Sequence, residues 1–370
     1  MFARHCETHC FDAIFTKVLP CCRRSDKTLG VYSMFEVWYG RDGTKVLVRL
    51  ATSADHTALV ETLQRSAPDA DPGSQVTIDD FDSFLSTPDM LVLWAESAEG
   101  ALGMLVASMP TTCESYIHSI RVAPNARNKG IAAILFKVAA RLCVRHQGAG
   151  SVGRWGVPGD NTTMLFWSDR HFSEKVSFTL YKASTAPSGD RVGVLPSGWS
   201  CRYGRGDDIS SIMAHLRGER GDFAITSSGW GTARLVSLHS ACALNVELLG
   251  RYISGEVFTH ATPFIEGGLQ HMCPPLLVFD GEGALVGLAT MSVVLFAGAR
   301  VLWLSYVDGS PCGLEVVLKV VRHEAAAAGC AAVCGYLPTL DLITTATNQD
   351  GYQKGAAEFF AYSWKNQDEI

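Results

Sequence analysis

One stretch decides the fold of this chain, and it reads Tyr116-Ile117-His118-Ser119-Ile120-Arg121-Val122-Ala123-Pro124-Asn125-Ala126-Arg127-Asn128-Lys129-Gly130-Ile131-Ala132. It starts as a strand, because apolar residues alternate at Ile120 and Val122, and Pro124 ends that strand. A basic loop with one glycine follows and leads into a helix. This order predicts a binding site for a diphosphate, because the free amides and the positive dipole end of a helix N-terminus attract an anion.

The helix expected from Ile131 has two distinct faces. Apolar residues recur at spacings of 0, 3, 4, 7 and 11, and they are Ile131, Ile134, Leu135, Val138 and Leu142. The basic residues Lys137, Arg141 and Arg145 take the opposite face. The pattern therefore predicts a helix that packs one side on a sheet.

Two common phosphate-binding motifs do not fit the loop. A Walker A motif needs a Gly-Lys-Ser/Thr run and dinucleotide-binding folds need Gly-x-Gly-x-x-Gly, and neither stands here. The run Arg127-Asn128-Lys129-Gly130-Ile131-Ala132 instead resembles the Arg/Gln-x-x-Gly-x-Gly/Ala signature of the GNAT acyl-CoA-dependent N-acetyltransferases. The alternative interpretation is an ordinary turn between a strand and a helix.

This resemblance implies a cofactor and the residues that bind it. The cofactor is acetyl-CoA, which is also a substrate. The family would use residues 127–132 to bind its diphosphate and the strand, at Ile120 and Val122, to pair with its pantetheine arm. Asn161, at the start of a later helix, matches a family asparagine near the pantetheine, and the alternative role is a helix N-cap.

Length and composition limit the class of protein. The 370 residues suffice for two domains, and 47% hydrophobic with 18% charged residues is an ordinary globular composition. A net charge of −6 argues against a dedicated nucleic-acid binder. Stable membrane insertion is not expected, because the longest apolar run, 293–306, contains Gly298 and Arg300. Residues 1–30 lack the pattern of a secretory signal, which favours a cytoplasmic location.

The 12 cysteines are scattered and are expected to be reduced thiols. Four of them lie in residues 1–35, at Cys6, Cys10, Cys21 and Cys22. Their spacing does not form a zinc ribbon, so no metal site is predicted. Cys21-Cys22-Arg23-Arg24 could be a palmitoylated anchor, but the preferred interpretation of residues 1–35 is a poorly structured lead.

Residues 45–185 are predicted to form one domain. The patterns predict, in order, a strand at 45–50, helices at 52–64 and 77–85, strands at 90–95, 101–108 and 115–122, a helix from 131, a strand at 152–157, a helix at 161–170 and a closing strand at 175–181. This order matches the GNAT acetyltransferase fold. The expected fold class is therefore α/β, with an α+β mixed sheet.

Residues 190–370 repeat this order after a linker at 186–190. Strand patterns at 275–288 and 301–307 echo 90–105 and 116–122, and the apolar spacing of the first helix recurs at Leu314, Val317, Leu318, Val321 and Ala325. The intervening loop, Asp308-Gly309-Ser310-Pro311-Cys312-Gly313, has no Arg or Lys and adds an acidic side chain. We expect a second, degenerate GNAT-like domain that does not hold coenzyme A in the same way; the alternative is chance similarity.

A narrower resemblance points to the histidine N-acetyltransferase family, whose members have two GNAT domains and acetylate the α-amine of free histidine. It rests on Arg121-Val122-Ala123-Pro124 with the loop, on the Thr87-Pro88-Asp89 turn, and on the aromatic strand at Phe359–Trp364 near the end of the chain. This chain has His118 where that family tends to carry a glutamate. The departure leaves the catalytic base and the acceptor open.

Three strand residues are candidates for catalysis. Alternation places Glu114, Tyr116 and His118 on one side of the strand, in line with the reactive end of the cofactor. Tyr116 stands where some relatives place a catalytic tyrosine, and His118 has the ordinary pKa best suited to proton transfer at neutral pH. The alternatives are a buried sheet tyrosine, a satisfied polar histidine and a charge at the strand edge. Trp167 falls where many GNAT enzymes have an acidic tyrosine, and tryptophan cannot supply that proton.

The sequence thus predicts an acetyl-CoA-dependent N-acetyltransferase whose partner is a small-molecule amine, preferably the α-amine of a free amino acid such as histidine. A protein N-acetyltransferase is the rival within this class. A non-catalytic protein that binds acyl-CoA is the rival outside it.

Overall fold

The computed structural model describes residues 36–58, 61, 84–86, 90–111, 114–147, 152–159, 161–172, 174–186, 195–219, 223, 234–236, 241–255, 269–296 and 298–364. The chain divides into a unit of residues 1–34 and a unit of residues 35–370, and the statements below concern the second unit. The predictions for residues 1–35, including their four cysteines, and for the Thr87-Pro88-Asp89 turn lie outside the described residues.

The first half of the second unit follows the predicted order of elements. The described elements are β1 (Glu36–Tyr39), β2 (Lys45–Leu50), η1 (Ser53–Asp55), β3 (Met90–Ser97), β4 (Gly100–Thr111), β5 (Glu114–Val122), η3 (Pro124–Ala126), α3 (Ile131–Gln147), β6 (Val152–Pro158), α4 (Thr162–His171) and β7 (Glu174–Ser184). Strand β1 was not predicted. The predicted helix at 52–64 is described at 53–58 and 61, where the turn η1 is followed by helical residues, and the predicted helix at 77–85 is described only at 84–86.

The second half repeats this order and adds a hairpin. Its described elements are β8 (Ser200–Tyr203), η5 (Gly206–Asp208), α5 (Ile209–Leu216), β9 (Arg234–Val236), β10 (Ala241–Ala243), α7 (Val246–Ser254), β11 (Leu269–Phe279), β12 (Leu285–Phe296), β13 (Ala299–Gly309), α8 (Pro311–Ala327), β14 (Ala332–Pro338), α9 (Asp341–Gln349) and β15 (Gln353–Trp364). The predicted strands at 275–288 and 301–307 and the helix around Leu314 are all present. Helices α3 and α8 each contain 17 residues.

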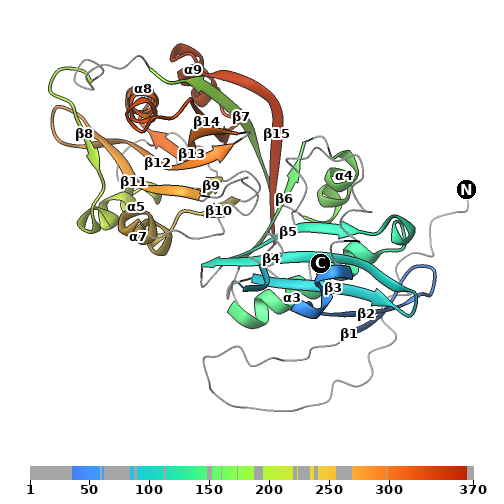
Figure 1. The fold of residues 1–370 in the computed structure, drawn as a ribbon. Coiled ribbons are helices and arrows are strands. Elements are labelled where there is room, and N and C mark those ends of the chain that lie inside the picture. The colour runs from blue at the N-terminus through green and yellow to red at the C-terminus, as the bar shows by residue number, and fades with distance from the viewer. Residues whose placement is uncertain are drawn as a thin grey trace, which may run out of the picture. The chain divides into compact units, whose positions relative to one another are not determined.

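The described strands form one 13-stranded sheet in the order β1-β2-β3-β4-β5-β6-β15-β7-β14-β13-β12-β11-β8, and β9 with β10 forms a separate two-stranded sheet (Figure 1). In the first half, neighbouring strands from β2 to β5 run antiparallel, and in the second half those from β11 to β13 do the same. The parallel pairs are β5–β6 and β13–β14. The mixed sheet agrees with the predicted α+β content.

The last strands of the two halves are exchanged, which corrects the prediction that 175–181 closes the first domain. Strand β7 pairs with β14 of the second half over Phe178–Ser184. Strand β15, from the end of the chain, pairs instead with β6 of the first half over Phe359–Trp364, and β15 and β7 also pair with each other. The predicted ranges 45–185 and 190–370 follow the repeat along the chain, but the sheet does not divide there.

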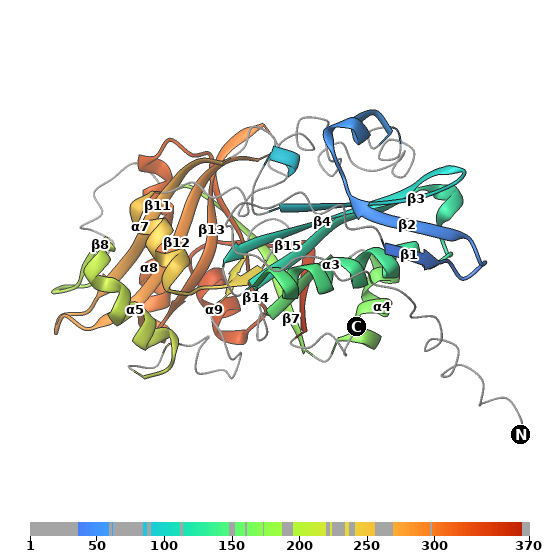
Figure 2. The ribbon, with the colours of Figure 1, turned by 90° about the horizontal axis from the view of Figure 1, so that it is seen from below.

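Each hydrophobic core contains side chains from the exchanged strand. In the first half, α3 packs on β3, β4 and β5 through Ile131, Leu135 and Val138, and Tyr362 of β15 is fully buried in the same cluster (Figure 2). In the second half, α8 packs on β11–β14, and Tyr181 of β7 is buried among those residues. Each half is therefore stabilised in part by apolar side chains that come from the other half of the chain.

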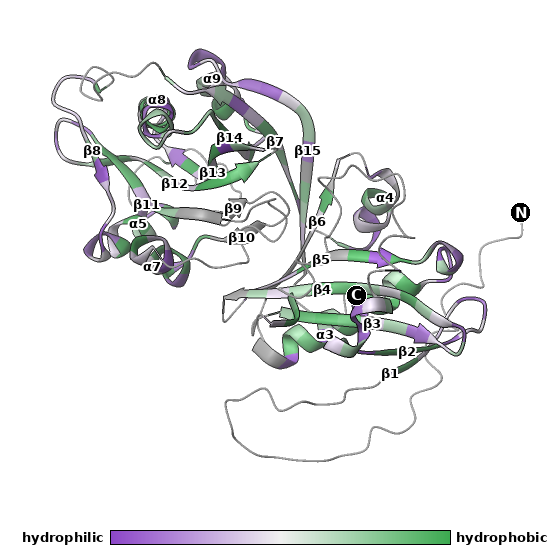
Figure 3. Cartoon of the chain, viewed as in Figure 1, coloured by the Kyte–Doolittle hydropathy of each residue, from purple (hydrophilic) through white to green (hydrophobic). Residues whose placement is uncertain are grey.

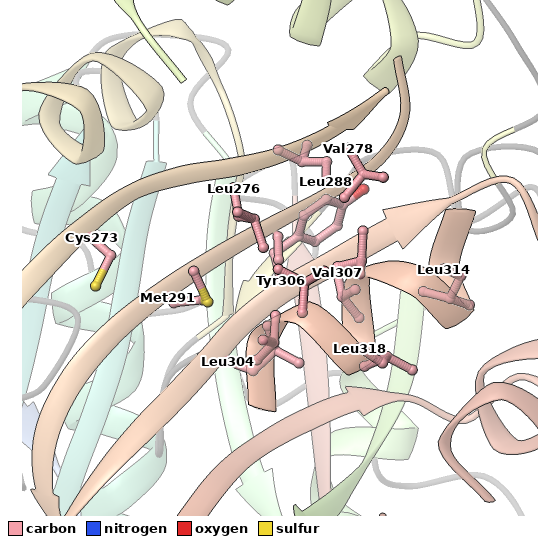
Figure 4. Packing of buried hydrophobic residues seen from close by; sticks show 14 of the residues in the cluster. Cys273, Leu276, Val278, Leu288, Met291, Leu304, Tyr306, Val307, Leu314 and Leu318 are labelled. Atoms are coloured by element: carbon pink, nitrogen blue, oxygen red, sulfur yellow. The ribbon is translucent and has the colours of Figure 1, made fainter. Parts of the chain in front are cut away.

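The core of the second half is packed around β12, β13 and α8. Leu304, Tyr306, Leu314 and Leu318 meet there, each less than a tenth exposed (Figure 4). Apolar residues follow the strands and the inward faces of the helices in both halves, as the hydropathy colouring shows (Figure 3). The apolar spacing read from the sequence thus marks the buried faces of α3 and α8.

Helices and cysteines add two observations. Among the described residues, no helix is both long and apolar enough to span a membrane. The cysteines whose side chains are described are free thiols, namely Cys143, Cys201, Cys273, Cys312, Cys330 and Cys334. Burial raises the pKa of Cys143 and of Cys273 to about 11, so both thiols stay protonated at neutral pH and serve as small apolar side chains.

Candidate active site

Strand β5 carries the three catalytic candidates and is bulged just beyond them. Tyr116 pairs with Ser108 and His118 with Val106, but Arg121 pairs with Met104, so β5 holds one residue more than β4 between these pairs. A bulge bends a strand and releases backbone groups from the ladder. The bulge therefore takes backbone groups near Ile120 out of the regular β4–β5 pairing, next to the catalytic candidates.

The parallel pairing between β5 and β6 ends close to the same point. It joins Glu114–Ile117 to Val152–Trp155 and is not continued by residues 118–122 of β5 or 156–158 of β6. Strand β10 of the second half lies next to both, with Cα atoms within 8 Å of each strand. The described backbone therefore brings a segment of the second half next to the strand pair β5–β6.

The candidate side chains differ in what the structure says of them. Glu114 and Tyr116 are buried, with 3% and 2% of their surface exposed, and the Ser108 hydroxyl lies 3.5 Å from the Tyr116 carbonyl oxygen, to which it donates. For His118 the structure gives the strand and its register only. Glu114 is buried at the first position of β5, and the roles of all three residues stay predictions.

Arg121 was part of the quoted motif but was not predicted as a site residue. Arg121 pairs with Met104, and His118 pairs with Val106. Met104 and Val106 both belong to the sheet face opposite α3, so the positions of Arg121 and His118 belong to that face as well. Burial lowers the pKa of the Arg121 guanidinium, which donates a hydrogen bond of 3.0 Å to the carbonyl oxygen of Ile120. A cation thus lies beside the bulge.

The predicted diphosphate loop has the backbone that its sequence implies. Pro124–Ala126 forms one 3-10 turn, after which Asn128 and Gly130 have positive φ angles of 63° and 84°. Asparagine and glycine are the residues that adopt this region most readily. Gly130 precedes the first residue of α3 and offers no side chain that could cap the helix, and Ile131 is buried beneath it. Arg127 and Asn128 are exposed.

The turn between β1 and β2 lies against this loop, which the sequence did not reveal. The Arg41 amide donates to the Lys129 carbonyl oxygen at 3.0 Å, and the Lys129 ammonium lies 3.0 Å from an Asp42 carboxylate oxygen. Lys129 was predicted to bind the diphosphate, and its charge is balanced in part by this ion pair. The signal that could have revealed the turn is Gly40-Arg41-Asp42-Gly43, a turn sequence with a second arginine.

Helix α4 places the last two predicted positions. The Asn161 side-chain oxygen accepts a hydrogen bond of 3.1 Å from the Met164 amide, so Asn161 caps α4, and a contact with pantetheine stays a prediction. Trp167 packs edge-on against Phe136 of α3, with ring centroids 5.4 Å apart, and against Phe172 at 5.7 Å. Its indole is therefore part of the aromatic contact between α3 and α4.

The corresponding loop of the second half is closed. The Ser310 hydroxyl caps α8 by accepting from the Gly313 amide at 3.1 Å, and it lies 3.4 Å from the Val286 carbonyl oxygen. A Cβ on Gly313 would lie 1.8 Å from that same oxygen, so β12 fills the space in front of the helix. Asp308 is fully buried and accepts from the Tyr306 hydroxyl and the Gly309 amide. This loop has neither the space nor the charge for a diphosphate.

Within the described part of the chain, no group of three or more His, Cys, Asp or Glu side chains is arranged to hold a metal ion.

Comparison with known proteins agrees with this geometry. Residues 56–167 match the model of the acetyltransferase (GNAT) family. A GCN5-related N-acetyltransferase from Sphaerobacter thermophilus is similar with a TM-score of 0.53 at 13% identity, over 86% of this chain and 95% of that one. A glucosamine N-acetyltransferase region of a fungal multi-domain GH3 β-N-acetylglucosaminidase has a TM-score of 0.54 at 10% identity, over 86% of this chain and 38% of that one.

A tandem GNAT protein from the clavulanic acid biosynthesis pathway is also similar, with a TM-score of 0.47 at 14% identity, over 90% of this chain and 98% of that one. A search of curated proteins finds no match. At such identities the solved structures show the fold alone. The family match, by contrast, spans the bulged strand, the loop at the start of α3 and Asn161. The chain therefore contains a GNAT acetyltransferase family domain, in a GNAT fold of mixed α/β content.

Proposed function

We propose that this protein is an acetyl-CoA-dependent N-acetyltransferase that acts on the amine of a small molecule, with the α-amine of a free amino acid such as histidine as the preferred acceptor. The reaction is proposed to take place in the cytoplasm. The second half is proposed to be a degenerate GNAT-like domain that binds no coenzyme A at α8.

One observation carries the proposal. A strand with a buried tyrosine and a bulge separates from its parallel neighbour and leads, through a proline turn, to a glycine at the start of a helix in a match to the acetyltransferase family. Among the described residues, a Cβ added at Gly130 would meet only the Arg41 side chain, at 3.6 Å, so no backbone atom closes the space directly in front of Gly130. This lack of backbone obstruction and the basic residues of the loop support a diphosphate site.

The chemistry needs few groups. The acceptor nitrogen attacks the thioester carbonyl carbon, a C–N bond forms, the C–S bond breaks, and one proton leaves the amine while the thiolate gains one. An α-amine has a pKa near ~8, so a weak base such as His118 suffices at neutral pH. Backbone amides near Ile120 would stabilise negative charge on the carbonyl oxygen. Tyr116 and Glu114 would orient the amine or the base.

The second half supports a small acceptor. Strand β10 lies within 8 Å of β5 and β6, so a segment of the second half stands beside the strand that carries His118. A protein substrate needs more free space beside this strand than a free amino acid does. The histidine-acetylating family tends to carry glutamate where this chain has His118. The identity of the acceptor therefore has to be decided by experiment.

The test is to incubate the purified protein with acetyl-CoA and each free amino acid in turn, and to measure thiol release. We expect turnover with at least one amino acid, histidine first. Turnover with peptide amines alone would replace the small-molecule acceptor by a protein acceptor. No turnover with any amine would remove the proposed activity.

A specific observation favours a second candidate, an acyl-CoA-binding protein without catalysis. Trp167 occupies the position of a family tyrosine and is fixed among Phe136, His171 and Phe172. Its indole cannot protonate a thiolate. The substitutions Tyr116→Phe and His118→Ala distinguish the two: loss of turnover with unchanged acetyl-CoA affinity supports the enzyme, and acetyl-CoA binding without turnover in the wild type supports the second candidate.

A further inference from the structure

We propose that Arg41 binds the 3′-phosphate of coenzyme A and makes the protein prefer coenzyme A to its 3′-dephospho form. The inference rests on the proposed function and extends it to a residue outside the segment that matches the acetyltransferase family, which begins at residue 56. It assigns to the turn between β1 and β2 a part in cofactor selection.

Three contacts fix this turn against the diphosphate loop. The Arg41 amide donates to the Lys129 carbonyl oxygen at 3.0 Å. The Lys129 ammonium is paired with Asp42 at 3.0 Å. Gly40 is buried so closely that a Cβ there would lie 3.2 Å from the Lys129 carbonyl oxygen. The turn and the loop are thus positioned by backbone and ionic contacts together.

The internal structure of the turn supports this position. Asp42 accepts from the Thr44 amide at 3.0 Å, and the hydrogen bonds with Thr44 together with Lys129 lower the pKa of Asp42 to about 2. Gly43 has a φ of +81°, a conformation that favours glycine. Asp42 therefore stays ionised throughout the physiological pH range, and its pairing with Lys129 does not depend on pH there.

The cationic side chains of Lys129 and Arg41 therefore differ in whether they have a partner. Lys129 has a carboxylate partner, whereas the Arg41 guanidinium has neither a hydrogen bond nor an ion pair with any residue that the structure describes. Arg41 is exposed, and its Cγ and Nε atoms lie 3.6 Å and 3.9 Å from the place of a Cβ on Gly130. A charge available for binding thus stands beside the glycine of the diphosphate loop.

The chemistry of coenzyme A identifies the group that this charge meets. Coenzyme A carries a diphosphate, which the loop is proposed to bind, and a dianionic 3′-phosphate on the adjoining ribose. A planar guanidinium can bind such a phosphate through two parallel hydrogen bonds. Because Arg41 stands on a separate turn outside residues 127–132, we assign it to the second of these phosphates.

The experiment measures the affinity of the full chain for coenzyme A and for 3′-dephospho-coenzyme A by titration calorimetry. We expect the wild type to prefer coenzyme A, and Arg41→Ala to weaken coenzyme A about tenfold while 3′-dephospho-coenzyme A changes less than about twofold. The matched control is Arg217→Ala, which removes an exposed arginine of the second half and should change neither affinity. Thermal unfolding of each variant checks that the fold is retained.

Other outcomes separate this assignment from the proposed function. An equal loss for both ligands in Arg41→Ala, or no loss for either, overturns the role of Arg41 and leaves the acetyltransferase proposal intact. The Arg127→Ala variant should weaken both ligands, because both contain the diphosphate. A wild-type protein that binds neither ligand overturns the proposed function and this assignment with it.

Discussion

The helix starts of α3 and α8 resemble each other in pattern and differ in what they can bind. Both helices contain 17 residues and follow a bulged strand on the same type of sheet. At α3 an exposed arginine and two residues with positive φ precede a helix without a capping side chain. At α8 a serine caps the helix and the Val286 carbonyl oxygen fills the remaining space. Helical periodicity therefore reports a packed face, and the preceding loop decides on binding.

An ion pair between an arginine and an aspartate, in contrast, is present in both halves. Arg49 donates to both oxygens of Asp55, at 2.7 and 2.6 Å, and Arg202 does the same with Asp208, at 2.6 and 2.7 Å. The spacing is six residues in each case, and each arginine also donates to the next carbonyl oxygen along the chain. The pair orders the turn after the first core strand, a structural need that both halves share.

The largest expected effect comes from opening the closed loop. Gly313→Ala should reduce the free energy of unfolding by more than about 3 kcal/mol, because the new Cβ would lie 1.8 Å from the Val286 carbonyl oxygen. Urea unfolding measures this. The matched control Gly250→Ala, in helix α7 with no atom within 4 Å of the added Cβ, should leave stability unchanged or raise it by up to about 1 kcal/mol. Equal effects of the two substitutions would show that α8 is not held against β12.

The second prediction concerns the open loop. Gly130→Ala should weaken acetyl-CoA binding by about tenfold or more, because Cβ enters the proposed diphosphate space, and should cost about 1–2 kcal/mol through strain at φ +84°. Gly283→Ala, at φ +81° in a turn of the second half, should cost the same stability without change in affinity. Calorimetric titration and urea unfolding measure both quantities. A loss of affinity in Gly283→Ala would mean that strain alone explains the result.

The third prediction uses the retained ion pairs. The hydrogen bonds from Arg49 lower the pKa of Asp55 to about 2, and those from Arg202 lower the pKa of Asp208. Asp55→Asn should cost about 2 kcal/mol at pH 7 and Asp208→Asn about 1 kcal/mol, since the Arg202 side chain is more exposed to solvent than that of Arg49.

The pH dependence of that cost follows from the lowered pKa. An aspartate with a folded pKa near 2 contributes its stabilisation above its unfolded pKa of about 4, and loses it as the pH falls toward 2. The gap in unfolding free energy between wild type and Asp55→Asn should therefore shrink between pH 4 and 2. A gap that stays constant from pH 7 to pH 2.5 would contradict the assigned ion pair.

The smallest expected effect lies at the edge of the open loop. Asp42→Asn keeps the acceptor for the Thr44 amide but removes the charge that pairs with Lys129. Acetyl-CoA affinity should rise about two- to threefold at low salt and less at high salt, because the ion pair is exposed to solvent. Asp207→Asn, an exposed aspartate of the second half, is the control and should change nothing. An unchanged or lower affinity in Asp42→Asn would show that Lys129 does not contribute to binding.

Local pattern predicted much of the fold. Strands 45–50, 152–157 and 115–122 and the helix from Ile131 appear where alternation and helical spacing placed them. The repeat of the second half was visible for the same reason, since apolar spacing reflects which face is buried. These features depend only on residues close to each other in the chain. The positive φ angles of Asn128 and Gly130, by contrast, were not predicted and came from the structure.

What the sequence by itself determined is the order of elements, their buried faces, the candidate strand and the loop in front of α3. Only the tertiary structure decided that β7 and β15 are exchanged, that Arg41 and Asp42 lie against Lys129, and that Val286 closes the loop before α8. The reason is physical: apolar alternation says that a strand is buried but not beside which strand. Contacts between residues far apart in the chain leave no period in its sequence.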